Sequence, residues 1–116
     1  MSIVYVVQNQ HRFDKEKGIF VPKFSLEEAK EYGELSYLLG PTASPFRPEP
    51  IIEEMQRKLW SFSDDDYLLL VGNPILIGCA VAIAAEHNEG KAALLQWSGT
   101  DRRYIPVNVN LKEKAA

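Results

Sequence analysis

The sequence has little of what several common functional classes need. It contains one cysteine, Cys79, and two well-separated histidines, His11 and His87. A single cysteine cannot form an intramolecular disulfide, and one cysteine with two distant histidines lacks the spacing of a zinc site. We therefore expect no metal and no cofactor, and a reducing compartment such as the cytoplasm suits the chain.

An excess of positive charge is also missing. The 13 Lys and Arg are outnumbered by 16 Asp and Glu, which gives a net charge of −3, so the chain lacks the field that draws proteins to nucleic acid or anionic lipid. The N-terminus has no basic region followed by a cleavage site, so no secretory signal is expected. The uncharged stretch 68–85 approaches the length of a membrane span, but Gly72, Asn73 and Pro74 interrupt it. A strand followed by a buried helix fits better, and we expect neither membrane nor nucleic-acid binding.

What the chain does have is the composition of one globular domain. Of its 116 residues, 46% are apolar and 25% are charged, close to the averages for folded domains. This length is enough for one hydrophobic core. We predict a single domain over residues 1–111 and a polar tail over residues 112–116.

Apolar and turn-forming segments alternate in the pattern of an α/β protein. Strands are expected at 3–7, 34–39, 67–71, 92–97 and 104–109, a short edge strand at 19–21, and helices at 26–32, from Pro50 to about 62, and at 74–87. Ser25 and Glu28 have the spacing of a capping box, and Asn73 with Pro74 suits a helix start. The order predicts a small Rossmann-like sheet with a parallel β-α-β-α-β heart and an antiparallel C-terminal hairpin strand. The places of the first strand and of segment 8–24 stay open.

The loops that follow parallel strands meet at one edge of a sheet, where ligands of open α/β sheets bind. Hydroxyls, arginines and helix N-termini at this edge suit an anion or a phosphate group. The predicted ligand-binding residues are Thr42, Ser44, Arg47, Asn73, Arg102 and Arg103. The alternative is a loop shaped simply by its prolines, because the chain has no Gly-rich phosphate motif and its prolines remove amide donors.

Other chemistry-bearing residues favour structural roles. The three aspartates 64–66 invite a magnesium site, but they precede their strand and should lie at the opposite edge, as a solvated connection. Cys79 is expected to be a small core residue, His11 to lie in a mobile polar loop and His87 near a helix end. No catalytic triad or carboxylate pair stands out. Catalysis therefore stays undecided, with binding favoured over it.

Two features indicate contacts with other chains. Trp97 and Tyr104 flank Arg102 and Arg103 at the predicted hairpin turn, which suits a protein interface better than single-stranded nucleic acid, because two arginines are few. Gly78 and Ala82 form a small-residue stripe on the apolar helix 74–87. This stripe would allow a homodimer.

Three parts of the chain resemble small proteins encoded by bacteriophages and prophages: residues 39–46, residues 65–74, and residues 95–99 with 103–107. The resemblance implies the cytoplasm of an infected bacterium, and it carries no activity. We therefore expect an accessory protein that binds a host or phage macromolecule, most readily a protein, without catalysis. The alternative is a small nucleotide- or phosphate-binding domain, with or without nucleotide cleavage, that uses the same edge of the sheet.

Overall fold

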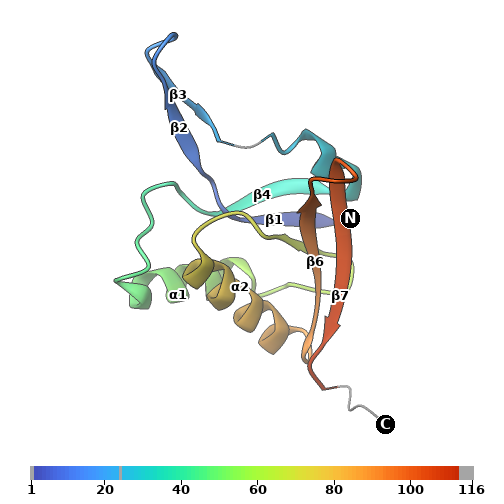
Figure 1. Cartoon of the computed structure of the whole chain (residues 1–116). Coiled ribbons are helices and arrows are strands. Elements are labelled where there is room, and N and C mark those ends of the chain that lie inside the picture. The colour runs from blue at the N-terminus through green and yellow to red at the C-terminus, as the bar shows by residue number, and fades with distance from the viewer. Residues whose placement is uncertain (1, 24, 113–116) are drawn as a thin grey trace.

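The computed structural model describes residues 2–23 and 25–112 (Figure 1). Along the chain the elements are β1 (Ile3–Gln8), β2 (His11–Asp14), β3 (Ile19–Pro22), the 3-10 helix η1 (Glu27–Tyr32), β4 (Glu34–Leu39), α1 (Pro48–Lys58), β5 (Tyr67–Leu69), α2 (Pro74–His87), β6 (Lys91–Ser98) and β7 (Arg103–Asn110). The predicted α/β class is confirmed. Most of the predicted polar tail, residues 113–116, lies outside the described residues.

Five strands form one sheet in the order β4-β1-β5-β6-β7, and β7 alone is antiparallel to its neighbour. The parallel part therefore has four strands rather than the three expected, because β1 lies between β4 and β5. Val4 and Val6 are buried on one face of the sheet, and Tyr5 and Val7 on the other. A continuous apolar run of this kind is what a central strand needs.

Both long helices cover the same face of the sheet (Figure 1). The connections β4-α1-β5 and β5-α2-β6 cross the sheet in the same direction, and crossovers of one hand then place their helices on one side. The apolar stripe of α1 is buried as predicted, with Ile51, Met55 and Leu59 packed in the larger core. In the part of the chain that the structure describes, η1 is the helix that packs on the opposite face, over a smaller core. That face is therefore left partly open.

Two helix starts differ from the prediction. Helix α1 begins at Pro48 rather than Pro50, which is compatible with proline in a first turn. The expected capping box does not form: η1 is a 3-10 helix preceded by Leu26, with no side-chain cap. The carbonyl of Ser25 instead accepts a hydrogen bond from the hydroxyl of Tyr104 at 3.3 Å. This segment is held by a tertiary contact rather than by its own capping.

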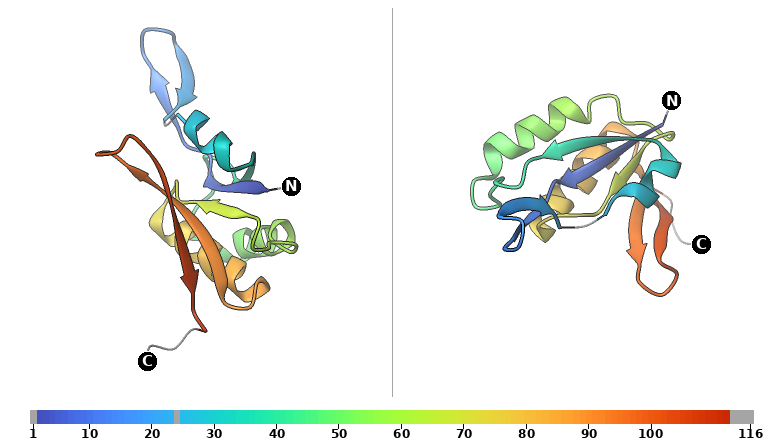
Figure 2. Two further views of the ribbon diagram at one scale, coloured as in Figure 1. Left: turned by 90° about the vertical axis from the view of Figure 1, so that its right-hand side faces the viewer. Right: turned by 90° about the horizontal axis from the view of Figure 1, so that it is seen from above.

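Within segment 8–24, residues 11–22 form a separate two-stranded antiparallel hairpin, β2-β3, that projects from the body (Figure 2). His11 therefore lies in a strand rather than in a mobile loop. The radius of gyration is 14.7 Å, whereas a compact chain of this length has a value of about 13 Å. The projecting hairpin accounts for this larger size.

The uncharged stretch 68–85 is divided between β5 and α2, as predicted. Among the described residues, no helix has both the length and the apolar character that crossing a membrane requires.

The raised pKa values of Tyr5 and Tyr104 predict that the stability of the fold falls at alkaline pH. Burial raises the pKa of both hydroxyls above 10.0, and the charges of Asp66 and Glu28 respectively raise them further. The unfolded chain loses these protons near pH 10 while the folded chain keeps them, so stability is complete below about pH 10 and falls as the pH rises through the folded pKa values. Urea unfolding across this range should show the fall. An equally steep fall in the Tyr5→Phe, Tyr104→Phe double variant would argue against this origin.

Candidate functional site

One buried side chain joins the loops at the carboxyl edge of the sheet. Gln8, the last residue of β1, is only 4% exposed. Its Nε2 donates to the carbonyl oxygens of Gly40 at 3.4 Å and Ala43 at 3.3 Å, and its Oε1 accepts from the amide of Asn73 at 2.9 Å. The loops after β4 and β5 are thereby fixed to each other. The sequence prediction missed this role because Gln8 belongs to the segment 8–24, whose place it left open.

Two adjoining cavities open beside this edge, on the less covered face of the sheet. The first, which we call the hairpin cavity, has a volume of about 490 Å³ and is lined by residues that include His11, Pro22, Leu26 and Tyr37. The second, the turn cavity, has a volume of about 670 Å³ and is lined by residues that include Lys23, Glu28, Gln96, Trp97, Arg102 and Tyr104. Both volumes fall in the range of small-molecule sites. Gln10, Ser25 and Val71 border both cavities.

Trp97, the exposed aromatic side chain of the turn cavity, is held in place by a neighbouring ring. Trp97 is 42% exposed, and its ring meets that of buried Tyr104 edge to face at 5.0 Å. The hydroxyl of Tyr104 donates to the carbonyl of Ser25, and its own carbonyl accepts from the hydroxyl of Tyr32 at 3.0 Å. The position of Trp97 is therefore set by a hydrogen-bonded neighbour.

Arg102 has an unusual backbone conformation. Its φ is 54°, in the left-handed region, and its amide donates to the carbonyl of Ser98 at 2.7 Å. An L-residue other than glycine costs about 1–2 kcal/mol in this region. Such strain gathers at functional sites, and here it belongs to a cationic side chain that lines a cavity.

The six predicted ligand-binding residues do not share one cavity. Arg102 lines the turn cavity, and Arg103 follows it at the start of β7, close enough to act on the pKa of Tyr32. The other predicted residues belong to the loop after β4 or to the start of α2. β4 is three strand spacings from β6, roughly 14 Å.

Two of those residues have local hydrogen bonds. The Oδ1 of Asn73 accepts from the amide of Ile75 at 2.9 Å and caps α2, and the Oγ of Ser44 accepts from the amide of Phe46 at 3.3 Å. These bonds account for the two side chains structurally. A ligand role for Thr42, Ser44, Arg47, Asn73, Arg102 and Arg103 together stays a prediction.

The predicted interface residues occupy different surroundings. Trp97 is exposed, whereas Tyr104, its partner on the neighbouring strand β7, is buried. Gly78 and Ala82 lie exposed on α2, next to Ile75, which is 54% exposed. A side chain at Gly78 would meet nothing within 4 Å. A homodimer through this stripe stays a prediction.

The opposite edge of the sheet holds a buried carboxylate. Asp66 is 5% exposed and accepts from the amide of Ile3 and from the amide and hydroxyl of Ser63. It is therefore a structural anchor and not the solvated residue expected. Asp64 is exposed, and its pKa is lowered by hydrogen bonds from Asn88 and Lys91. Among the described residues, no three His, Cys, Asp or Glu are grouped so as to hold a metal ion.

Comparison with known proteins places the chain in one family. The sequence profile of the Phage Pam3 gp32-like protein family matches residues 2–111, which include the hairpin and both cavities. No significant match was found to a curated protein or to a solved structure. The resemblance to phage proteins is thus confirmed over nearly the whole chain, and the protein belongs to the Phage Pam3 gp32-like family.

Proposed function

We propose that this phage protein is an accessory protein that acts by binding another protein of the phage or of its host, without catalysis. The observation that carries the proposal is the apolar surface of the projecting hairpin. Phe13, Ile19 and Phe20 are 51%, 54% and 70% exposed. A lone two-stranded hairpin is marginally stable in water, so covering these side chains with a partner is favourable.

The hairpin presents one continuous aromatic face. Phe13 is paired with Phe20 and His11 with Pro22, and residues two apart on a strand point to the same side. We call these four side chains the hairpin face. The two phenyl rings meet edge to face at 5.3 Å. Large aromatic side chains arranged in this way are typical anchors of protein interfaces.

The base of the hairpin face joins the hairpin cavity. His11 and Pro22 line this cavity together with Tyr37 of the edge strand β4, which is 44% exposed. A projecting aromatic pair next to a concavity offers a partner both an anchor and a pocket. The surface therefore suits a folded or extended protein segment with apolar side chains of its own.

Charge supports a protein partner over nucleic acid. Along the hairpin the cations Arg12, Lys15 and Lys17 are interleaved with the anions Asp14 and Glu16. The whole chain has a net charge of −3. Binding to a phosphate backbone relies on many Lys and Arg contacts, whereas residues 11–23 carry four cations, Lys23 included, against two anions, a small excess.

The test compares partner capture by the wild type and by a Phe13→Ser, Phe20→Ser double variant in phage-infected bacteria. We expect the variant to retain its partner at least about tenfold less well, because buried aromatic anchors dominate interface energies. The matched control is Phe46→Ser, since Phe46 is 87% exposed but lies in the loop before α1. Equal recovery of the same partners by both variants would refute the proposal, as would recovery of no partner by the wild type.

The alternative function, binding of a nucleotide or phosphate ligand, has one observation in its favour. Trp97 and Arg102, which the sequence places at one turn, line the same cavity. That cavity is separate from the hairpin face, so the two functions are compatible.

A further inference from the structure

We infer that the turn cavity binds a small ligand that combines a planar ring with an anionic group, the chemistry of a nucleoside monophosphate. In this arrangement the ring lies against Trp97, and the anion lies at Arg102 and Lys23. The inference develops the alternative function and is independent of the protein partner, because it uses neither the phenylalanines of the hairpin face nor Tyr37.

Part of the cavity lining is held by hydrogen bonds. Its floor is the chain 70–72 that follows β5. The amide of Leu70 donates to the carbonyl of Leu95 at 3.1 Å, and the carbonyl of Val71 accepts from the amide of Gln8 at 2.9 Å. Tyr104 and Ser25, joined by their hydrogen bond, close one side. A floor and wall held in this way are pre-formed for a ligand.

Trp97 supplies the planar surface that a ring needs. It is the large aromatic side chain of the cavity that remains exposed, at 42%, while Tyr104 supports it at 5.0 Å. Stacking on an aromatic side chain is a principal source of affinity for bases and tolerates different bases, because every base has a π face. A planar heterocycle is therefore the ring type that this wall suits.

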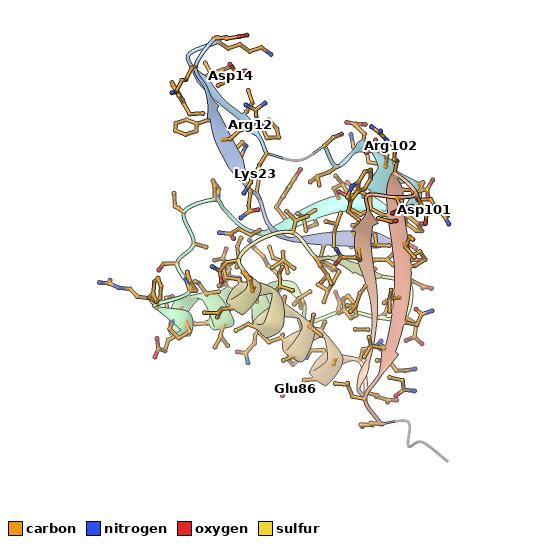
Figure 3. The ribbon with its side chains drawn as sticks, in the orientation of Figure 1. Arg12, Asp14, Lys23, Glu86, Asp101 and Arg102 are labelled. Carbon is orange, nitrogen blue, oxygen red and sulfur yellow. The ribbon has the colours of Figure 1, made fainter. Side chains whose placement is uncertain are left out.

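The charged side chains of the cavity suit an anion. Two cations line the cavity from different elements: Arg102 lies on the β6-β7 turn, and Lys23 lies at the end of the hairpin (Figure 3). Among the described residues that line the cavity, Glu28 is the one with a carboxylate. A guanidinium binds a phosphate through two parallel hydrogen bonds, and a lysine adds a second positive charge. Two cations and one anion leave a net positive site in a chain whose total charge is −3.

The remaining polar groups suit the rest of such a ligand. Gln10 and Gln96 line the cavity with amide groups that both donate and accept, as the edge of a base requires. The carboxylate of Glu28 accepts from a sugar hydroxyl or from a ring amine. The cavity thus offers a partner for each part of a nucleoside monophosphate.

The backbone of Arg102 is strained. A left-handed position in a hairpin turn is ordinarily filled by glycine or asparagine, and φ at Arg102 is 54°. Glu89, in the turn after α2, has a similar φ of 55°, so this conformation belongs to the turn, and the ligand is inferred from the side chains that line the cavity.

The experiment measures the fluorescence of Trp97 in a Trp60→Phe background, which removes the other tryptophan; Trp60 is exposed and contacts His87 near the end of α2. The probes are AMP, GMP, CMP and UMP, with adenosine and inorganic phosphate as partial ligands and a 5′-phosphorylated trinucleotide. We expect saturable quenching by at least one monophosphate. The two partial ligands should bind at least about tenfold more weakly, because each lacks half of the contacts.

Substitutions at Arg102 and Trp97 test which side chains contact the monophosphate. Arg102→Gly should weaken binding of the monophosphate at least about tenfold, as expected for loss of a charge-assisted hydrogen bond, while leaving the melting temperature unchanged or higher by about 2 °C through relief of strain. Arg102→Lys should bind at an intermediate level, and Trp97→Ala should lose at least about tenfold. The matched control is Arg57→Ala, an exposed arginine on α1, which covers the other face of the sheet; this variant should bind as the wild type does.

Several outcomes would overturn the inference: no quenching by any monophosphate, phosphate binding as tightly as the monophosphates, or equal losses for Arg102→Gly and Arg57→Ala. Tighter binding of the trinucleotide would support the site and identify the end of a nucleic-acid strand as the source of the ligand; preference for the mononucleotide would support it with a free nucleotide as the source. The Phe13→Ser, Phe20→Ser variant should bind the ligand normally. Failure of the partner proposal is thus distinguishable from failure of this one.

Discussion

Replacement of Gly72 by alanine should lower the free energy of unfolding by about 3 kcal/mol, through backbone strain and overpacking together. The φ of Gly72 is 136°, a conformation that residues with a side chain rarely adopt. A Cβ at this position would lie 2.6 Å from the Cβ of Gln8. Because Gln8 holds the loops after β4 and β5, it cannot move aside without breaking its hydrogen bonds to Gly40, Ala43 and Asn73.

Urea unfolding followed by circular dichroism would measure this loss. Gly78→Ala is the matched control, because Gly78 lies within α2 and a Cβ there meets nothing within 4 Å. That variant should gain up to about 1 kcal/mol, the difference in helix propensity between the two residues. A Gly72→Ala protein as stable as the wild type would show that the carboxyl edge is less tightly packed than these distances require. Since Gly72 also lines the turn cavity, ligand binding should weaken in the same variant.

Local sequence signals predicted the helices of the body well. The spacing of Ile51, Met55 and Leu59 determines which face of α1 is buried, because 3.6 residues make one turn, and the structure buries all three. Asn73 followed by Pro74 marks the start of α2 where it is found. In each case the signal and the contact that it predicts lie within a few residues of each other.

The order of the strands could not be predicted in the same way. The apolar run of β1 indicates burial on both faces but does not name its neighbours, since β4 and β5 offer similar edges to it. The hairpin was predicted in part: the short strand at 19–21 is found as β3, whereas its partner β2 was not expected. The exposed Phe13 and Phe20 are not buried by any element of this chain that the structure describes, so no core contact marked the pairing of the two strands.

The candidate site shows the same division between local and distant information. The carboxyl edge follows from the parallel strands, and Trp97 and Arg102 come together because one short turn joins them. Lys23 reaches the same cavity from the segment whose position was open, and Glu28 reaches it from the predicted helix 26–32, found as η1. Thr42 and Ser44 were expected nearby, but β1 separates their loop from β5. Insertion of one strand was therefore enough to divide the predicted set.

Replacement of Asp66 by alanine should lower the free energy of unfolding by about 4 kcal/mol, since hydrogen bonds to a charged group contribute about 1.5–3 kcal/mol each and the donors left behind are unpaired. The Oδ1 of Asp66 accepts from the amide of Ile3 at 3.0 Å, and its Oδ2 accepts from the amide of Ser63 at 3.0 Å. These bonds join the start of β1 to the turn before β5. The variant therefore loses the tie between two neighbouring strands at the amino edge of the sheet.

Asp64→Ala is the control, because Asp64 lies two residues away but is exposed, and its ion pair with Lys91 at 3.2 Å is open to solvent. Such pairs contribute little, so this variant should unfold close to the wild type. Asp66→Asn should be intermediate, since an amide has one oxygen to accept where the carboxylate has two. Equal unfolding of the Asp64→Ala and Asp66→Ala proteins would show that the buried carboxylate is not an anchor. A large difference would instead assign Asp66, and not its exposed neighbour Asp64, to the stability of the amino edge of the sheet.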